Sequence, residues 1–414
     1  TRDGRPLSAS GLVAAGRLAG STAKASTRAL SRGQSLVYLG ASLTTAEAWA
    51  AAKKLQARAD VVWAEPDLPV YASDASPVTP NDPLFTSQWD LWDTAAAAGG
   101  DSTHVPSAWN RTKGDPSVVV AVLDSGLTVH PDITGSVVAP TAADPVVKGY
   151  DFVSGDPDYS GSTYYVANDG NGRDADPSDP GDWITAADAS GSTAGGVLLN
   201  CFVDTSSWNG THVTGTIVAK QGNGEGITGI APGVKVQPVR VLGRCGGYAS
   251  DINDAIEWAS GGHVAGVPDN ATPASVISMS LGGPGECLVS TQTAISNARS
   301  RGTTVVVAAG NEGVSMDPNV AAGGAQPADC LGVVRVAATT RSGGIADYSN
   351  YGSSSVPITV AAPGGSGAGG SQDILSTVNP GTTVPVVAAT ASPSLRYAAY
   401  AGTSMATPHV AAAV

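Results

Sequence analysis

Residues 402–409 read Gly402-Thr403-Ser404-Met405-Ala406-Thr407-Pro408-His409, and small apolar residues follow to the last position. A Gly-Thr-Ser turn before such a run indicates a loop that enters a buried helix, with Ser404 at or near the helix N-terminus. The free N–H groups and positive dipole end at that place favour negative charge, which a serine creates when it attacks a carbonyl. Serine is also a favoured helix cap, so this stretch alone does not identify a nucleophile.

Two stretches further upstream favour the nucleophile. Val118–Leu123 is a continuous apolar run, typical of a strand buried in a parallel sheet, and Asp124-Ser125-Gly126 follows it. A carboxylate at the end of such a strand lies where open α/β sheets place catalytic groups. The second stretch, Ser207–Thr216, changes from a polar, glycine-broken loop to small apolar residues and predicts another tightly packed helix.

Together these three stretches resemble the signatures of the subtilisin-like serine proteases, in that family's chain order of Asp, His and Ser. A fourth stretch, Val305–Asn311, resembles the family's strand that ends in an oxyanion-hole asparagine. The resemblance extends in register from Asn81 to the last residue. It implies that Asp124 orients the base, that Ser404 is the nucleophile and that Asn311 donates to the oxyanion.

The second signature departs from the family pattern at the base. The family usually has His-Gly-Thr-His-Val and uses the first histidine, but Asn209 stands at that position here. His212 shares a helix face with Asn209 and differs by a turn in height, so it cannot simply substitute. An amide cannot accept the serine proton and return it, and we expect this chain to be nearly inactive in proteolysis.

Two readings of Asn209 are open. Asparagine is close to histidine in size and polarity, so it suits a precursor disabled to stop self-cleavage. The alternative is a natural pseudoprotease that uses its cleft only to bind peptides. The retained Asp124, Asn311 and Ser404 favour the disabled precursor. An α/β-hydrolase esterase is excluded, because Met405 is followed by Ala406 where a Gly-x-Ser-x-Gly elbow needs glycine.

The middle of the chain alternates between buried strands and helices. Such alternation predicts a doubly wound, mainly parallel α/β sheet with right-handed crossovers. The expected strands are Val118–Leu123, Val234–Val241, Val276–Ser280 and Thr304–Ala308, and the expected helices follow Gly210 and cover Asp251–Ser260 and Thr291–Arg301.

Residues 1–73 predict a separate small α+β domain with its linker, before a catalytic domain over residues 74–414. The expected helices are Leu7–Leu18 and Thr44–Arg58, and the expected strands are Ser35–Leu39 and Asp60–Asp67. This order resembles the ferredoxin-like inhibitory propeptide of subtilases with its first strand missing. The resemblance implies an intramolecular inhibitor and chaperone whose tail lies along the substrate cleft, with processing between about residues 70 and 80. An unrelated small domain is the alternative.

Two acidic regions are candidate calcium sites. The resemblance implies a structural Ca²⁺ site that many family members carry, with these ligands: Asp82, Asp132, Gln221, Asn223, Glu225 and Ile227. A second loop carries clustered oxygen ligands on glycine turns, at Asp169, Asp174, Asp176 and Asp179. No glutamate closes this loop at the EF-hand spacing, so calcium and a merely solvated acidic loop both remain open.

The resemblance also implies a polypeptide-binding cleft. Two segments resemble the walls of the family's S1 pocket, and they comprise Ser280, Leu281, Gly282, Ala308, Ala309 and Gly310. Their small residues leave the pocket open, with Ala325 near its floor. We therefore expect a broad preference for large apolar or aromatic side chains at P1, the substrate residue before the cleaved bond.

Charge and cysteine content suggest an exported protein. A net charge of −13 with only 14% charged residues argues against nucleic acid as a partner, and no run of eighteen apolar residues appears. The glycine-rich segments around Cys245 and Cys287 follow successive strands, so Cys245–Cys287 is the predicted disulfide, and the partners of Cys201 and Cys330 stay open. We expect a secreted monomer whose export signal has been removed and whose catalytic domain is truncated at its C-terminus.

Overall fold

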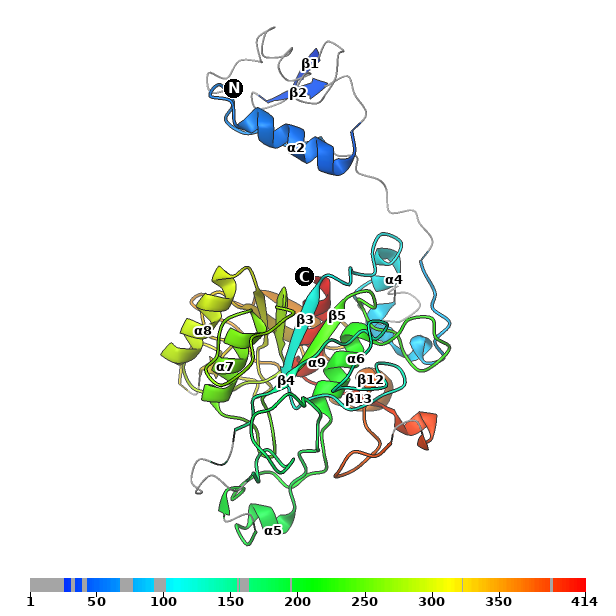
Figure 1. Cartoon of the computed structure of the whole chain (residues 1–414), viewed down its shortest axis with the longest axis vertical. Coiled ribbons are helices and arrows are strands. Elements are labelled where there is room, and N and C mark those ends of the chain that lie inside the picture. The colour runs from blue at the N-terminus through cyan, green and yellow to red at the C-terminus, as the bar shows by residue number, and fades with distance from the viewer. Residues whose placement is uncertain are drawn as a thin grey trace. The chain divides into compact units, whose positions relative to one another are not determined.

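The structure is a computed structural model that divides into two compact units, Thr1–Asp74 and Ala75–Val414 (Figure 1). The residues that it describes are 26–30, 34–38, 43–67, 77–92, 102–154, 156, 164–193, 196–321, 323–387 and 390–414. In these residues, no helix has both the length and the apolar composition that a bilayer-crossing segment needs.

A seven-stranded sheet lies at the centre of the larger unit, and every strand pair in it is parallel. The strand order is β11-β10-β8-β6-β3-β5-β4. The chain therefore adds strands on one side of β3 and then on the other, which makes the carboxyl end of β3 a topological switch point. The strands are β3 (Val119–Asp124), β4 (Tyr150–Asp151), β5 (Lys235–Arg240), β6 (Val276–Met279), β8 (Thr304–Ala308), β10 (Val334–Thr339) and β11 (Val360–Pro363).

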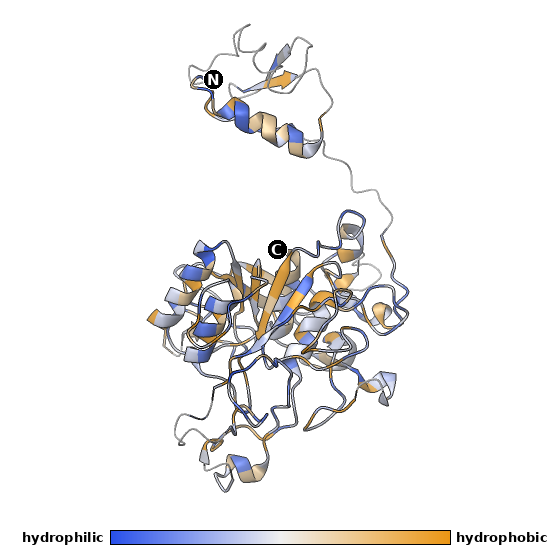
Figure 2. Ribbon diagram, viewed as in Figure 1, coloured by the Kyte–Doolittle hydropathy of each residue, from blue (hydrophilic) through white to orange (hydrophobic). Residues whose placement is uncertain are grey.

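Helices cover both faces of this sheet, because its strands are apolar on both sides (Figure 2). On one face, Val120 and Val122 of β3 pack in one core with α6 (Asn209–Val218) and α9 (Thr403–Ala413). On the other face, Leu123 of β3 packs in a second core with residues of the remaining two long helices, α7 (Ala249–Ala259) and α8 (Val289–Ser300). The doubly wound, mainly parallel α/β sheet predicted from the sequence is confirmed.

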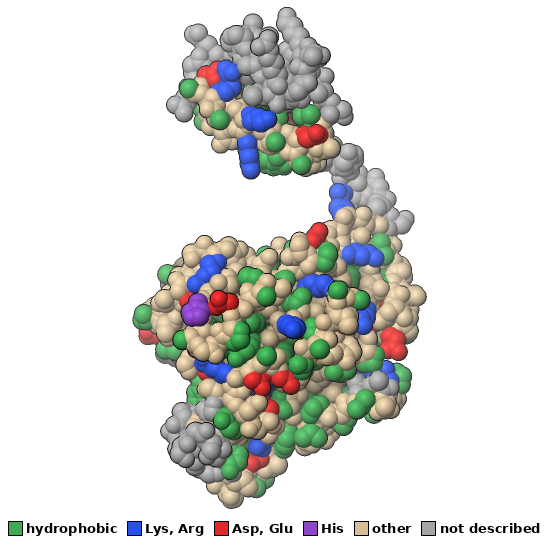
Figure 3. All heavy atoms as spheres, in the orientation of Figure 1, with side chains coloured by type: hydrophobic (Ala, Val, Ile, Leu, Met, Phe, Trp, Pro, Cys, Tyr) green, Lys and Arg blue, Asp and Glu red, His purple; other side chains and the backbone are tan. Residues whose placement is uncertain are grey.

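Short elements complete the larger unit. Two antiparallel pairs lie outside the central sheet, β7 with β9 and β12 with β13. They are β7 (Gly283–Pro284), β9 (Ala325–Gln326), β12 (Ile374–Thr377) and β13 (Tyr397–Tyr400), and the short helices are α4 (Val105–Ala108), α5 (Ala186–Ala189), η2 (Phe85–Ser87), η3 (Trp89–Leu91), η5 (Gly370–Gln372) and η7 (Pro393–Leu395). On the face of the larger unit drawn in Figure 3, acidic, basic and apolar side chains are interspersed.

The smaller unit has a hairpin and one long helix among its described residues. Strands β1 (Ser26–Ala29) and β2 (Ser35–Tyr38) pair antiparallel, and α2 (Thr45–Gln56) begins with a capping box between Thr44 and Glu47. The predicted strand at Ser35 and the predicted helix after Thr44 are confirmed.

Two other predictions for the smaller unit have different outcomes. The predicted strand Asp60–Asp67 is wrong, because these residues form no strand in the structure. Val62 and Trp63 are 58% and 48% exposed, so the apolar residues do not alternate between a buried and a solvated face, and Pro66 cannot donate to a ladder. The predicted helix Leu7–Leu18 lies outside the described residues.

The disulfide prediction Cys245–Cys287 is wrong. The bonds are Cys201–Cys245 and Cys287–Cys330, with Cα–Cα distances of 5.6 and 5.0 Å. Cys245 follows β5 and bonds to the long segment before α6, whereas Cys287 follows β6 and bonds to the segment between β9 and β10. β5 and β6 lie on opposite sides of β3, and although the loops after both strands line one cleft, each cysteine bonds to a segment that packs on its own side of the sheet.

Candidate active site

The nucleophile candidate Ser404 lies in the first turn of α9 and is partly exposed. The helix behind it is held by burial of Met405 and Ala406 against the sheet. The Ser404 hydroxyl donates to the Ser280 carbonyl oxygen at 3.1 Å, and the Ser280 hydroxyl donates to the Ser404 carbonyl oxygen at 2.8 Å. Backbone N–H groups in the first turn of a helix have no intrahelical acceptor, so the Ser404 N–H is suited to bind an anion.

The oxyanion candidate Asn311 follows β8 and is fixed by the residue next to the nucleophile. Its amide oxygen accepts from the Thr403 N–H at 2.8 Å and from the Thr403 hydroxyl at 2.9 Å. The same hydroxyl accepts from the Gly310 N–H at 3.1 Å. Both bonds use the amide oxygen of Asn311 and leave its amide nitrogen out of this contact.

The residue at the base position, Asn209, is the first residue of α6. With its amide oriented so that donors face acceptors, its nitrogen donates to both carboxylate oxygens of Asp124, at 3.0 and 3.2 Å. The preceding Trp208 is buried in a left-handed conformation (φ 52°), and its indole N–H donates to the Gly381 carbonyl oxygen at 2.7 Å. The turn into α6 therefore presents residue 209 directly to Asp124.

His212 faces a different part of the protein. Its ring is buried and stacks on Tyr400, with 4.6 Å between the ring centroids. Its Nε2 lies 3.1 and 3.2 Å from the carbonyl oxygens of Ile374 and Ala398. These contacts place His212 in the packing of α6 against β12 and β13.

Asp124 ends β3 and is fully buried. Burial raises the pKa of its carboxyl group to about 8, although the Ser125 N–H that donates to it at 2.8 Å lowers the pKa. The nearby carboxylates of Asp179 and Asp182 raise the pKa further. A cationic group at position 209 would oppose these effects, because an adjacent positive charge favours the ionised carboxylate.

A cleft with a volume of about 470 Å³ lies beside Ser404 and Asn311. All six residues predicted to wall the S1 pocket line it, and so does Ala325. The structure thus brings the β6 and β8 ends together with the nucleophile in one hollow. The lining residues from these segments are Ser280, Leu281, Gly282, Gly283, Ala308, Ala309 and Gly310.

The first acidic region collects residues from three distant segments. Asp82 accepts from the backbone N–H groups of Gly222 and Asn223, with distances of 2.8 to 3.1 Å. Asp132 is fully buried and accepts from the Asn223 side-chain nitrogen at 2.8 Å and the Ile227 N–H at 3.0 Å. Both polar atoms of the Gln221 side chain are buried without a partner in the described residues. We name Asp82, Asp132 and residues 221–227 the first acidic loop.

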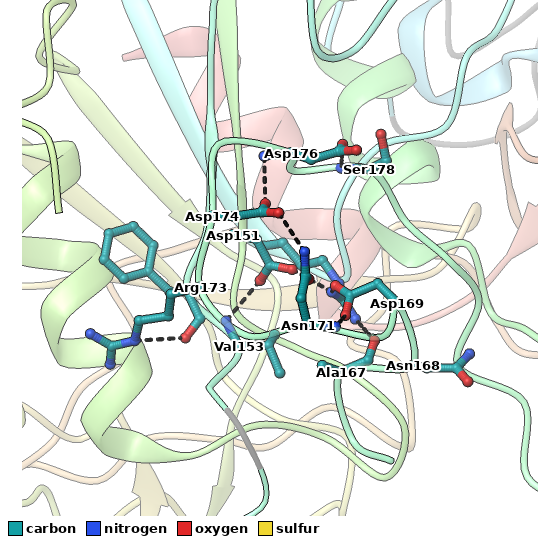
Figure 4. A network of polar contacts seen from close by, with 12 residues as sticks. Asp151, Val153, Ala167, Asn168, Asp169, Asn171, Arg173, Asp174, Asp176 and Ser178 are labelled. Atoms are coloured by element: carbon teal, nitrogen blue, oxygen red, sulfur yellow. Dashed lines mark hydrogen bonds and ion pairs between the residues drawn. The ribbon is translucent and has the colours of Figure 1, made fainter. Parts of the chain in front are cut away.

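The second acidic region is organised by arginines (Figure 4). Arg240, 1% exposed, forms ion pairs with the buried Asp151 and with Asp169 at 2.6 Å. Asp174 accepts from the Asn171 side chain at 2.8 Å and from the Asp176 N–H at 2.7 Å. We name residues 169–176 the second acidic loop. In the described residues, no three carboxylates of this region offer oxygens within 4.8 Å of one another.

Asp179 lies apart from that loop, although its sequence position suggested otherwise. It is buried, and its carboxylate accepts from the Ser125 hydroxyl at 2.7 Å. The sequence reasoning missed Thr403, Ser125 and Asp182 as neighbours of the catalytic candidates. Thr403 adjoins Ser404 and Ser125 adjoins Asp124 in the quoted stretches, which is a usable signal, but nothing in the sequence indicated Asp182.

The site thus combines a strand-end carboxylate, a first-turn serine and an amide donor beside a cleft, which is the arrangement of a serine hydrolase with a carboxylate-oriented base. The sequence profile of the Subtilase family (Peptidase_S8) matches residues 115–414, and the chain belongs to this family. Its fold is the subtilisin-like α/β fold.

Relatives extend over almost the whole chain. It is 43% identical, over 94% of its length, to the extracellular protease of Xanthomonas campestris pv. campestris, and covers 57% of that protein. It is 38% identical, over 89% of its length, to the extracellular basic protease of Dichelobacter nodosus, and covers 52% of it. A solved structure of proteases from Pseudoalteromonas arctica has 44% identity and a TM-score of 0.67, covering 81% of this chain and 85% of that one. The chain therefore spans about half the length of these two sequence relatives.

Proposed function

We propose that this chain is the proenzyme form of a secreted serine endopeptidase and that Asn209, in place of the catalytic histidine, leaves it nearly inactive. One observation carries the proposal: the Asn209 amide nitrogen donates to the Asp124 carboxylate, where the Nδ1–H of a histidine base would donate. An asparagine side chain fills this position and keeps that hydrogen bond, but it has no second ring nitrogen to take a proton from Ser404. In line with this, the Ser404 hydroxyl donates to a backbone carbonyl instead.

With a histidine at position 209, the residues support acyl transfer to Ser404. The histidine takes the serine proton while the hydroxyl attacks the peptide carbonyl, and Asp124 holds the tautomer that makes this possible. The Asn311 amide nitrogen and the Ser404 N–H stabilise the oxyanion. The histidine then protonates the leaving amine, and water releases the acyl group from Ser404 by the same route in reverse.

We further propose that the cleft beside Ser404 binds polypeptides with a large apolar or aromatic P1 side chain. Glycine and alanine at positions 282–283 and 308–310 of the cleft walls would leave room for such a side chain, and Ala325 lines the same space. The segments 280–283 and 308–310 line the cleft and would provide edges for an extended peptide to pair with.

The first acidic loop is the proposed structural Ca²⁺ site. Its buried carboxylates, Asp82 and Asp132, have no Lys or Arg ion-pair partner in the described residues, whereas the exposed Glu225 of the same loop pairs with Arg396 at 3.6 Å. The unpartnered Gln221 amide gives this loop a further buried polar group. Carboxylate, amide and backbone oxygens are the ligands that Ca²⁺ prefers. Asp132, Asn223 and carbonyl groups of residues 221, 225 and 227 would hold the ion, together with Asp82. The ion would stabilise the loop and supply no catalytic chemistry.

The smaller unit is the proposed inhibitory propeptide, within residues 1–73, and the remaining residues are the proposed catalytic domain. The division of the chain into two compact units, with a boundary after Asp74, supports this assignment. Two disulfides and relatives named as extracellular proteases support an exported protein. We propose that the larger unit is a monomer.

The test is to compare the Asn209→His variant with the given chain by denaturing gel and by a peptide-amide assay. We expect only the variant to shorten by about the mass of the first unit and to cleave peptide, with activity abolished again by an added Ser404→Ala change. A variant that folds but stays full length and inert would overturn the proposal. The better account would then be a pseudoprotease whose cleft only binds peptides.

A further inference from the structure

The segment between β4 and α6 contacts the turn after β3, which follows Asp124, and leads into residue 209. Backbone bonds join it to the turn after β3, where the Leu127 N–H donates to the Pro177 carbonyl and the Asp179 N–H donates to the Leu127 carbonyl, both at 3.1 Å. We propose that Asp179 and Asp182, carried by this segment, are positioning residues that hold Asp124 and residue 209 in catalytic register. This inference rests on the proposed function.

Asp179 connects the end of β3 to the start of α6. Its carboxylate accepts from the Ser125 hydroxyl at 2.7 Å, and the Ser125 oxygen in turn accepts from the Gly210 N–H at 3.1 Å. Its second oxygen accepts from the Gly181 N–H at 2.8 Å. All of these groups are buried, so the hydrogen bonds are protected from water and fix one geometry. The residue after Asp124 is thereby attached to the residue after Asn209.

The start of α6 and the turn after β3 pack so closely that their relative position must be fixed. A Cβ atom added at Gly210 would lie 2.1 Å from the Gly126 carbonyl oxygen, and one at Gly126 would lie 2.7 Å from the Pro177 carbonyl oxygen. The start of α6 thus rests directly on the turn after β3, with the segment that carries Asp179 beneath that turn. A small shift of the start of α6, of the turn after β3 or of the segment that carries Asp179 would move residue 209 relative to Asp124.

Asp182 controls the other side of residue 209. Its two carboxylate oxygens accept from the Ser207 N–H at 2.6 Å and from the Ser207 hydroxyl at 2.7 Å. The Ser207 oxygen then accepts from the Asn209 N–H at 3.3 Å. The backbone of Asp182 is held in turn, because its N–H donates to the Ser206 hydroxyl at 3.2 Å. The Asp182 carboxylate therefore reaches the backbone N–H of residue 209 through one intervening side chain, that of Ser207.

The negative charges of Asp179 and Asp182 also affect the catalytic groups, in addition to the hydrogen bonds that these side chains form. Both carboxylates raise the pKa of Asp124, and Arg240 is the cation that acts on Asp179. Negative charge close to the Asp124 carboxylate also stabilises an imidazolium at position 209. Removal of one charge should therefore lower the pKa of the base and shift the acid limb of the kcat/KM profile to lower pH. A merely structural role would not move this limb.

The catalytic test uses the full chain with Asn209→His as the parent, and adds Asp179→Asn or Asp182→Asn. We expect kcat to fall about 10- to 100-fold with little change in KM, because a misplaced base slows chemistry more than binding. The acid limb should move to lower pH in Asp182→Asn and less in Asp179→Asn, because burial raises the pKa of the Asp179 carboxyl group to about 7 and leaves it little charge on that limb. The matched control is Asp176→Asn, an exposed aspartate of the same segment that accepts from the Ser178 N–H and should leave both readouts unchanged (Figure 4). Parent-like kcat and pH profiles in both variants would overturn the inference.

A second measurement does not depend on catalysis. In the given chain with Asn209, native-state hydrogen exchange should show the amides of Ser207 and Asn209 exchanging about tenfold faster in Asp182→Ala, and that of Gly210 in Asp179→Ala. Asp176→Ala should leave them unchanged. Unchanged protection in folded variants would overturn the positioning role. If the Asn209→His parent is inert but exchange accelerates as expected, the proposed protease function fails while the positioning contacts stand.

Discussion

The first and second acidic loops look alike in sequence and differ in how their charge is balanced. Asp82 and Asp132 of the first loop face backbone N–H groups and side-chain amides, with no Lys or Arg ion-pair partner in the described residues. Asp169 of the second loop, with the neighbouring Asp151, surrounds the buried guanidinium of Arg240. A cluster of carboxylates therefore does not by itself indicate a metal site. What separates the buried carboxylates of the two loops is whether the chain already supplies a cation, since in the first loop only the exposed Glu225 has one, Arg396 at 3.6 Å.

The largest expected effect comes from removing the built-in cation. Arg240→Met leaves the buried Asp151 without its partner, and we expect the free energy of unfolding to fall by about 3–5 kcal/mol, as for other broken buried ion pairs. Denaturant unfolding measures this change, once without calcium and once with about 5 mM calcium. This concentration exceeds the dissociation constants of weak extracellular calcium sites, which reach about 1 mM. Arg301→Met, at the partly exposed ion pair with Glu257, is the control and should cost clearly less. Full rescue by calcium would show that the second loop can use an external ion.

The next largest expected effect is the loss of stability when metal is removed from the first acidic loop. Chelation should lower the free energy of unfolding by about 2.7 kcal/mol relative to calcium at a hundred times its dissociation constant. Asp132→Asn should abolish the difference between chelator and calcium, whereas Asp174→Asn in the second loop should preserve it. Thermal unfolding under the two conditions measures both. If Asp174→Asn is the variant that loses the difference, the assignment of the two loops is reversed.

A smaller effect is expected at the hydroxyl that contacts the first acidic loop. The Tyr397 hydroxyl donates to the Asp132 carboxylate at 3.2 Å. Tyr397→Phe removes this bond and should cost about 1 kcal/mol in the absence of calcium. Denaturant unfolding in chelator gives the value. No loss at all would mean that the Asp132 carboxylate is not held by this hydroxyl.

The smallest effect is expected at the solvent end of the second acidic loop. Asp176 is exposed, and its carboxylate accepts from the Ser178 N–H at 3.0 Å. Asp176→Asn can keep that bond through its amide oxygen, so we expect a stability change within about 0.5 kcal/mol and no change in calcium response. A large loss would instead indicate that its charge matters and would weaken the contrast between the loops.

Local pattern was enough to predict four of the seven strands of the central sheet and the helices α6, α7 and α8, but not β4, β10 or β11. Val119–Asp124 is buried at every position, and the apolar run predicted that strand directly. The catalytic candidates were implied by the resemblance of the quoted stretches to the family signatures, and the structure places each beside a regular element: Asp124 ends β3, Asn311 follows β8 and Ser404 lies in the first turn of α9. Such positions are set by local sequence and by the common edge of a parallel sheet.

What could not be predicted depends on which distant segments meet. The Cys201–Cys245 bond joins the segment before α6 to the loop after β5, and the contact of Asp182 with Ser207 joins two distant parts of that same segment; no periodicity encodes either. The strand expected at residues 60–67 failed for a related reason. Its apolar residues suggested a buried face, but only a packing partner makes such a face, and Val62 and Trp63 remain exposed.

The two disulfides determine how the protein should be produced. Each joins residues more than 40 positions apart, and each ends beside the cleft, where Gly246 follows Cys245 and Pro327 precedes Cys330 by three residues. The central sheet contains none of the four cysteines. Material made in a reducing cytosol would therefore keep the spectroscopic signature of the sheet while the peptide-binding rim loosens. Expression into an oxidising compartment is needed before any comparison of peptide affinity between variants, and a free-thiol assay is the quality control that secondary-structure measurements cannot replace.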